Sequence, residues 1–299
     1  MAKHPIRLPK IPNAPAKRLV PNGRSAYITP MKNLIPFRKK PPLVAVIRLE
    51  GMIASSSGPG RGPALNDTGL AQMIEKAFRK GKPAAVALAI NSPGGSPVQS
   101  SLIAARIRRL ADEKNIPVYA FVEDVAASGG YWLACAADEI WADHGSVVGS
   151  IGVISAGFGF QELIERYGIE RRMFTAGKNK STLDPFQPQK PADVKRYNAL
   201  LTDMHGIFKS YVTERRGDRL SSDKDLFTGE FWLAGTGQEL GLVDGIGHLV
   251  PKMKEIFGDK VRLVPYRQKR SMFSRFGAQL ATDAIGGLVE RAAFARFGA

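Results

Sequence analysis

A serine and a lysine are the side chains of this sequence best suited to chemistry. Ser128 stands in Ala127-Ser128-Gly129-Gly130-Tyr131, and Lys180 stands in Gly177-Lys178-Asn179-Lys180-Ser181. A serine hydroxyl is a weak nucleophile until a base takes its proton, and a desolvated lysine amine can be that base. The pair predicts acyl transfer through Ser128, as in a serine/lysine peptidase.

Ser128 has small neighbours on both sides, which suits a nucleophile at the turn from a strand into a helix. Two alanines precede it and two glycines follow it. Glycines let a substrate backbone approach closely, and a helix N-terminus favours the negative charge that develops in acyl transfer. The alternative is an ordinary serine N-cap, which the surrounding motifs disfavour.

Lys180 is the expected base. A lysine must lose about three pKa units to accept protons near neutrality, which requires burial or hydrogen bonds to its amine. Ser181, Thr182 and Ser150 are candidates to hold that amine. Lys178 is the competing lysine, and on an extended segment it would point the opposite way. The alternative for either lysine is a solvated surface position.

A glycine turn upstream could stabilise an oxyanion. Gly94 and Gly95 end the run Asn91-Ser92-Pro93-Gly94-Gly95, which follows an apolar stretch. Their backbone N–H groups could bind the charged oxygen of a tetrahedral intermediate. The alternative is a plain turn from strand to helix. The position of the turn before the serine helix favours the oxyanion role.

Other catalytic sets fit less well. The four histidines lack an obvious second polar partner, and Cys135 lies on an apolar helical run that indicates a core position. No His/Cys cluster has metal-ligand spacing and no phosphate loop is present, so we expect neither a metal nor a cofactor. The histidines are His4, His144, His205 and His248.

Strands and helices alternate along the middle of the chain. Apolar runs of strand length each end near a glycine turn, and amphipathic stretches follow them. This alternation predicts an α/β fold with a mostly parallel core sheet and flanking helices. The expected strands are 43–49, 84–90, 118–122, 147–154 and 171–174, and the expected helices are 70–79, 100–111, 128–137 and 191–216.

The net charge of +16 belongs mostly to the ends. Residues 1–42 contain ten Lys or Arg, no Asp or Glu and nine prolines, so we expect a disordered basic segment that could attract an anionic membrane surface. With one basic cluster and no recognition fold beside it, nucleic acid is not expected as a partner. Residues 43–266 form the expected enzyme domain. Residues 267–299 carry an apolar stripe for a partner subunit or a membrane.

No signal peptide or transmembrane helix is evident. The basic start is not followed by an apolar region, and the longest uncharged run, 145–161, is broken by glycines and serines. A lone cysteine suits a reducing compartment. We therefore expect a cytoplasmic protein, peripherally bound to the cytoplasmic membrane at most.

Five motifs resemble those of the SppA-type signal peptide peptidases, over roughly residues 43–255. These bacterial serine/lysine peptidases have a ClpP/crotonase-like fold. The motifs are Ile90 to Gly95, Ala127 to Tyr131 with Ala136-Ala137-Asp138, Gly149 to Val153, Gly177 to Ser181, and Glu239 to Asp244.

The resemblance implies roles for the matching positions. Ser128 would be the nucleophile, Lys180 the general base, Ser150 a hydrogen-bond partner of the lysine amine, and Gly95 an oxyanion donor. It further implies cleavage of remnant signal peptides without a cofactor, and a homo-oligomer in which neighbouring protomers share the dyad. Family members usually carry an N-terminal transmembrane helix, which the charged and apolar ends would replace here.

Two other functions compete with this hypothesis. A crotonase-like acyl-CoA enzyme would use the same glycine turn and would need a carboxylate, for which Glu123 and Asp124 are the nearest candidates. A non-catalytic oligomeric scaffold at the membrane would need no dyad, and the intact set of Ser128, Lys180 and Ser150 argues against it.

Overall fold

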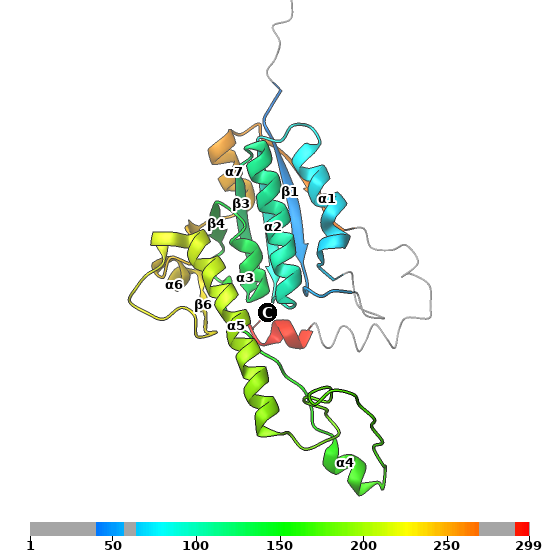
Figure 1. Ribbon diagram of the computed structural model, residues 1–299. Helices are drawn as coiled ribbons and strands as arrows, with labels where there is room; N and C mark the ends of the chain where they lie inside the picture. Colours follow the sequence, from blue (N-terminus) through cyan, green and yellow to red (C-terminus); the bar gives the residue numbers. More distant parts are fainter. Residues whose placement is uncertain (1–39, 57–63, 269–290, 299) are drawn as a thin grey trace, which may run out of the picture. The chain divides into compact units, whose positions relative to one another are not determined.

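The computed structural model describes residues 40–56, 64–268 and 291–298. A mostly parallel sheet flanked by helices forms its centre, which confirms the predicted α/β class (Figure 1). The sheet order is β6-β5-β3-β2-β1-β8, and β4 lies off this path between β3 and β7. All of these pairs are parallel except β5 with β6.

The central strands are buried on both faces, as expected of a parallel sheet covered by helices. Seven of the eight residues of β2 are buried, so the strand has no polar face. The strands are β1 (Leu43–Glu50), β2 (Ala85–Ser92), β3 (Val118–Ala127), β4 (Glu139–Ala142), β5 (Val147–Gly149), β6 (Phe231–Leu233), β7 (Gly245–Ile246) and β8 (Arg262–Tyr266).

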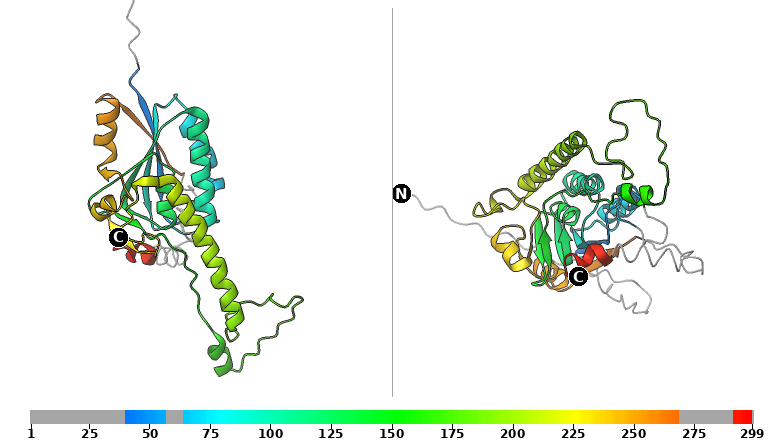
Figure 2. Two further views of the ribbon diagram at one scale, coloured as in Figure 1. Left: turned by 60° about the vertical axis from the view of Figure 1, so that its left-hand side comes forward. Right: turned by 90° about the horizontal axis from the view of Figure 1, so that it is seen from below.

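Helices cover the two faces of the sheet unequally. Helices α1 (Asp67–Arg79), α2 (Pro97–Lys114) and α3 (Gly129–Ala134) pack on one face and build the main core. Helix α7 (Leu249–Phe257) covers the opposite face, where Met253 is buried among residues of β1, β2 and β3 (Figure 2). The remaining helices are α4 (Gln161–Arg166), α5 (Pro191–Arg216) and α6 (Ala234–Glu239).

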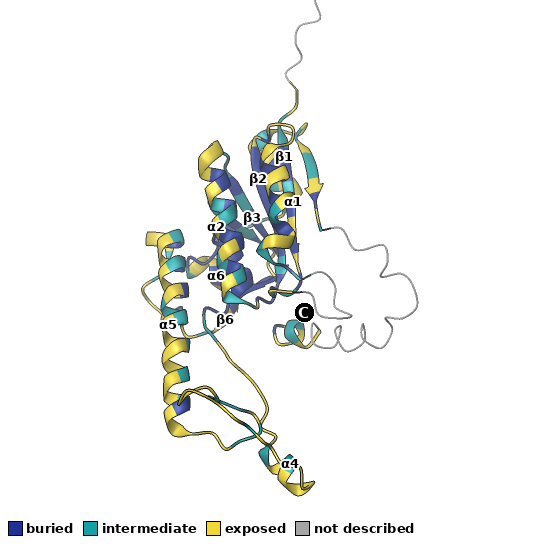
Figure 3. Cartoon of the chain, turned by 45° about the vertical axis from the view of Figure 1, so that its right-hand side comes forward, coloured by how far each residue is buried: buried dark blue, intermediate teal, exposed yellow. Residues whose placement is uncertain are grey.

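Helix α5 packs on the core through its C-terminal half only. Trp132 of α3 stacks on Phe208 at a centroid distance of 4.7 Å and on Tyr211 at 5.2 Å. The N-terminal half is largely exposed, and Figure 3 shows it leading away from the buried sheet toward α4. The helix has the predicted bounds, and two of its large apolar side chains, Leu200 and Ile207, are exposed.

Residues 152–190, called the extension below, differ most from the predictions. The strand expected over 147–154 ends at Gly149, because Gly149 and Ser150 both adopt positive φ. No strand forms over 171–174. The predicted basic segment 1–42 and the C-terminal stripe lie mostly outside the described residues, at 1–39 and 269–290.

Candidate active site

The candidate site lies where four neighbouring strands end. Because β1, β2, β3 and β5 are parallel, the residues that follow them meet at one edge of the sheet. A cleft of about 670 Å³ opens there, and its lining includes Gly94, Gly95, Ser128 and Ser150. The structure thus brings together four of the five residues that the sequence singled out.

Ser128 is half-buried, has a strained backbone and does not cap its helix. Its φ of 51° and ψ of −121° place a non-glycine residue in a region that side chains rarely adopt. The side chain makes no capping hydrogen bond, which excludes the ordinary N-cap. The Ser128 N–H instead donates to the Gly149 carbonyl at 2.8 Å, so the end of β5 holds the turn in place. A strained serine between a strand and a helix is the geometry of a nucleophile elbow.

Gly95 and Gly129 present two backbone N–H groups beside the serine. Neither N–H has a hydrogen-bond partner among the described residues, whereas the Gly94 N–H donates to Ser92 Oγ. A Cβ built on Gly129 would lie 3.3 Å from the Gly95 nitrogen, so the two groups are close together. Gly94 and Gly95 were predicted from the sequence as oxyanion donors, and Gly129 was not. The residue after a nucleophile is nevertheless a common oxyanion donor.

The glycines of the serine turn are required by packing within the protein itself. A Cβ on Gly129 would lie 2.4 Å from Ser100 Oγ, and one on Gly130 would lie 2.3 Å from the Ser92 carbonyl oxygen. Gly95 has a φ of 141°, and a Cβ there would lie 2.0 Å from the Ile53 carbonyl oxygen. At these glycines α3 approaches α2 and β2 closely, and the glycine turn approaches the segment that follows β1.

Ser150 and His205 also line the cleft. Ser150 is 5% exposed and has a φ of 52°. His205, on α5, has its Nε2 3.1 Å from the carbonyl oxygen of Ile151, the residue that follows Ser150. Sequence reasoning set His205 aside for want of a polar partner, and the partner proves to be a backbone carbonyl that no sequence motif reveals.

Lys180 is exposed on the extension and is not among the described residues that line the cleft. Its segment is a series of turns over 178–183, so the expectation of an extended segment at Lys178 and Lys180 is wrong. The Lys180 N–H donates to the Gly177 carbonyl at 3.2 Å. Within one chain, the structure therefore presents the serine and the lysine on separate surfaces.

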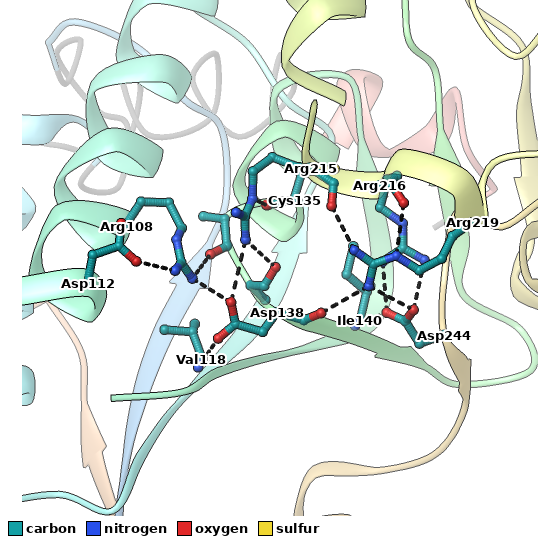
Figure 4. Close-up of polar contacts among 12 residues, drawn as sticks. Arg108, Asp112, Val118, Cys135, Asp138, Ile140, Arg215, Arg216, Arg219 and Asp244 are labelled. Carbon is teal, nitrogen blue, oxygen red and sulfur yellow. Dashed lines mark hydrogen bonds and ion pairs between the residues drawn. The ribbon is translucent and has the colours of Figure 1, made fainter. Parts of the chain in front are cut away.

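Arginines hold the C-terminal end of α3, the helix that begins after Ser128 (Figure 4). Arg215 donates to the carbonyls of Cys135 at 2.8 Å and Ala137 at 3.0 Å. Arg108 donates to the Ala136 carbonyl and to Asp138. These bonds satisfy carbonyls that a helix end leaves free, and positive charge suits that end of the helix dipole.

A buried ion pair anchors the same region. The Arg216 side chain is 2% exposed and bonds Asp244 at 2.8 Å and the Gly241 carbonyl. Burial would raise the pKa of Asp244, but hydrogen bonds from Arg216 and the Ile140 N–H outweigh it and hold that pKa below its ordinary value. Asp244 therefore stays ionised and neutralises the arginine.

Other candidate nucleophiles and acids lie elsewhere. Cys135 is fully buried, and burial raises the pKa of its thiol to about 12, so it belongs to the core as predicted. Glu123 pairs with Arg48, and Asp124 accepts a hydrogen bond from Asn91. Neither carboxylate is among the described residues that line the cleft.

The end of the chain borders the cleft. Phe297 is buried against Val125, Ala127 and Val147, and its ring meets Phe231 edge to face at 5.0 Å. Ala293, Arg296 and Phe297 form part of the cleft wall. This part of the predicted C-terminal segment therefore docks on the core.

The described residues contain neither a metal site nor a membrane-crossing helix. No group of His, Cys, Asp or Glu in that part of the chain has the arrangement of a metal site. None of its helices is long and apolar enough to cross a membrane.

This chain is similar to a protein family and to several individual proteins. The profile of the family described as "Peptidase family S49" matches residues 111–256. A Brucella melitensis protein named Na(+)/H(+) antiporter NhaA is 46% identical over 286 residues, which are 90% of this chain and 39% of that protein. The probable protease SohB of Haemophilus influenzae is 34% identical over 204 residues, or 67% of this chain and 56% of that protein.

The chain thus spans less than two thirds of either of these relatives. A putative protease of Synechocystis sp. is 31% identical over 210 residues, which are 70% of each chain. The part matched by the family profile contains the serine turn with strands β3 and β5. Since the likeness reaches across most of a protease of comparable length, this chain belongs to peptidase family S49, together with the SppA-type proteases.

Proposed function

We propose that this S49 peptidase is a serine endopeptidase with Ser128 as nucleophile and Lys180 as general base. The observation that carries the proposal is the strained Ser128 backbone beside two unpaired N–H groups, in a cleft at the carboxyl edge of the sheet. Strain of this kind costs about 1–3 kcal/mol and accumulates at functional sites.

The proposed mechanism is acyl transfer through Ser128. Ser128 Oγ attacks the peptide carbonyl while its proton passes to the neutral lysine amine. The N–H groups of Gly95 and Gly129 bind the oxyanion, and Ser150 orients the amine. The ammonium then protonates the leaving amine, and the lysine activates the water that hydrolyses the acyl ester.

The lysine would come from a neighbouring copy in a homo-oligomer. Lys180 does not line the cleft of its own chain, and the extension that carries it exposes large apolar side chains such as Phe158 and Phe174. Contact with a second copy would cover those side chains and remove water from the amine, which favours its neutral form. One interface would thus complete the site.

Apolar peptides released from membranes, including remnant signal peptides, are the proposed substrates. Met52, Val153, Ile154 and Phe297 provide apolar walls to the cleft. Peripheral binding to the cytoplasmic membrane would bring the enzyme to such peptides. The ten basic residues and no acidic ones in 1–42 support this, since each basic residue near an anionic surface contributes about 1 kcal/mol. Deleting residues 1–42 should weaken flotation with anionic vesicles, and unchanged flotation would reject membrane attraction.

Mixing two inactive variants tests the shared dyad. Ser128→Ala and Lys180→Ala should each lose peptidase activity by more than ~100-fold, while Lys178→Ala serves as the matched lysine control. If the dyad is shared, co-assembly of the two inactive variants restores activity, because some junctions join an intact serine to an intact lysine. Failure to restore activity would reject sharing, and near-normal activity in either single variant would reject the dyad.

A non-catalytic scaffold and an acyl-CoA enzyme remain weaker candidates, with no observation in their favour. A fluorophosphonate probe separates enzyme from scaffold, since only an activated Ser128 is labelled. Calorimetric binding of an acyl-CoA would support the other candidate.

A further inference from the structure

We propose that His205 is a positioning residue that holds Ser150 in place for its contact with the catalytic lysine. The inference rests on the proposed function, in which Ser150 orients the amine of Lys180. His205 acts through the backbone, because its Nε2 lies 3.1 Å from the Ile151 carbonyl oxygen. A carbonyl only accepts hydrogen bonds, so Nε2 carries the proton and donates it.

The turn that His205 contacts is strained and needs restraint. Gly149 and Ser150 have φ values of 105° and 52°, and the second is costly for a residue with a side chain. The Ser150 N–H donates to the Glu230 carbonyl at 2.7 Å, and the Gly152 N–H donates back to the Ser150 carbonyl at 2.9 Å. These backbone bonds hold the two ends of the turn.

His205 supplies the side-chain restraint. Among the described residues, its ring is the only side chain that bonds the backbone of residues 149–152. Ile151 is fully buried, so its carbonyl would lose a partner without ready replacement by water. Without this bond, the turn could relax from positive φ and move the Ser150 hydroxyl.

The helix that carries His205 also contacts α3, the helix that begins after Ser128. Phe208 and Tyr211, on the same helix, stack on Trp132, which follows Ser128 in α3. The Ser128 N–H in turn donates to the carbonyl of Gly149, in the turn that His205 restrains. Helix α5 therefore contacts both α3 and the turn at Ser150, so His205 would fix the spacing between Ser150 and the serine turn.

Substitutions with different reach test this role. Gln carries an N–H the same number of bonds from Cβ as histidine Nε2, whereas Asn matches the other ring nitrogen. We expect His205→Ala and His205→Asn to lower kcat by about tenfold, the upper range for one hydrogen bond, with little change in KM. His205→Gln should remain within about threefold of the parent by the same reasoning.

Labelling and a double-mutant cycle complete the test. The rate of fluorophosphonate labelling at Ser128 should follow the same order of variants, with melting temperatures recorded for each. In a Ser150→Ala background, His205→Ala should have little further effect, because both changes disturb one interaction. A full further loss in that background, or undiminished activity in His205→Ala alone, would overturn the proposal.

His205 could instead be the base itself. In that case His205→Gln would be as inactive as His205→Ala, and the acid limb of the pH–rate profile would disappear in both. That result would also overturn the positioning role. The Ser128→Ala and Lys180→Ala variants report separately on the dyad, so failure of the proposed function is distinguishable from failure of this inference.

Discussion

Two serines with positive φ, Ser128 and Ser150, line the cleft. Each is held by backbone bonds to the edge of the sheet, Ser128 to Gly149 and Ser150 to Glu230. Such conformations persist only when the surrounding structure determines them. The folded core therefore maintains strain at the residues proposed to carry out the chemistry.

Replacing Ser128 with glycine should separate stability from activity. Glycine adopts a φ of 51° and a ψ of −121° without strain, although it costs about 0.5–1 kcal/mol in chain entropy. The strain is worth about 1–3 kcal/mol, so we expect Ser128→Gly to raise the free energy of unfolding by ~1 kcal/mol. The variant should therefore unfold at a higher denaturant concentration than the parent. Ser128→Ala keeps the strain and should match the parent in stability.

Urea unfolding of the three proteins measures this difference, and both variants should be inactive. If Ser128→Gly is no more stable than Ser128→Ala, then the turn is not strained at this residue. The nucleophile elbow would lose its physical basis, whatever the peptidase assay gives.

The sequence predicted those parts of the site that are formed by neighbouring residues in a single turn. Small residues around Ser128 and the paired glycines before α2 indicated tight turns after buried strands, and the turns are there. His205 could not be predicted, because it meets Ile151 only after α5 packs on α3. The Gly129 N–H could have been predicted as an oxyanion donor, because the residue after the serine of a nucleophile elbow commonly has this role.

At the scale of elements, α3 is fixed at both ends. Its N-terminal turn is held by the close contacts of Gly129 and Gly130, and arginines bind the carbonyls at its C-terminal end. The Arg216–Asp244 pair fastens the end of α5 beside it. Loss of that pair should loosen the framework under Ser128.

Asp244→Asn should destabilise the protein strongly. Arg216 is almost fully buried, and removing the charge of its partner leaves an uncompensated cation, at a cost of about 3–5 kcal/mol. The exposed pair of Arg172 and Glu170 provides the control, since Glu170→Gln should cost less than about 1 kcal/mol. Chemical denaturation at neutral pH compares the two.

The same pair predicts a pH dependence. The pKa of Asp244 is lower in the folded protein, so its stabilising effect is present above the unfolded value of about 4. That contribution falls as pH drops through the folded pKa. The parent should therefore lose part of its advantage over Asp244→Asn in acid. A constant difference between them down to pH ~2 would contradict the lowered pKa.

The strand predictions were correct where the strands are buried in the core. Largely apolar runs predicted β1, β2 and the first half of β3, because parallel strands covered on both faces are mostly apolar. The extension offered no such pattern. Residues 171–174 have strand-like composition, but no neighbouring strand lies beside them to pair with.

At the scale of the whole molecule, exposed apolar side chains concentrate on the extension and the adjoining half of α5. Phe174 is 95% exposed and Phe158 is 82% exposed. Phe158 lies 6.3 Å from Phe160 between ring centroids, and Phe160 lies 5.7 Å from Phe186. Exposed patches of this kind mark interaction sites. The same extension carries Lys180, which links assembly to catalysis in the proposed function.

Phe158→Ser with Phe174→Ser should weaken the proposed homo-oligomer and its peptidase activity together. Burying one such ring contributes about 1.5–3 kcal/mol, so we expect self-association to fall by tenfold or more. Both rings are exposed within a protomer, so the melting temperature of the dissociated protomer should not change. Val250→Ser, on α7 and also exposed, is the matched control and should alter neither property. Light scattering over a concentration series gives the association state, and a peptide assay on the same samples gives activity. Full activity in a dissociated double variant would show that one chain completes its own site.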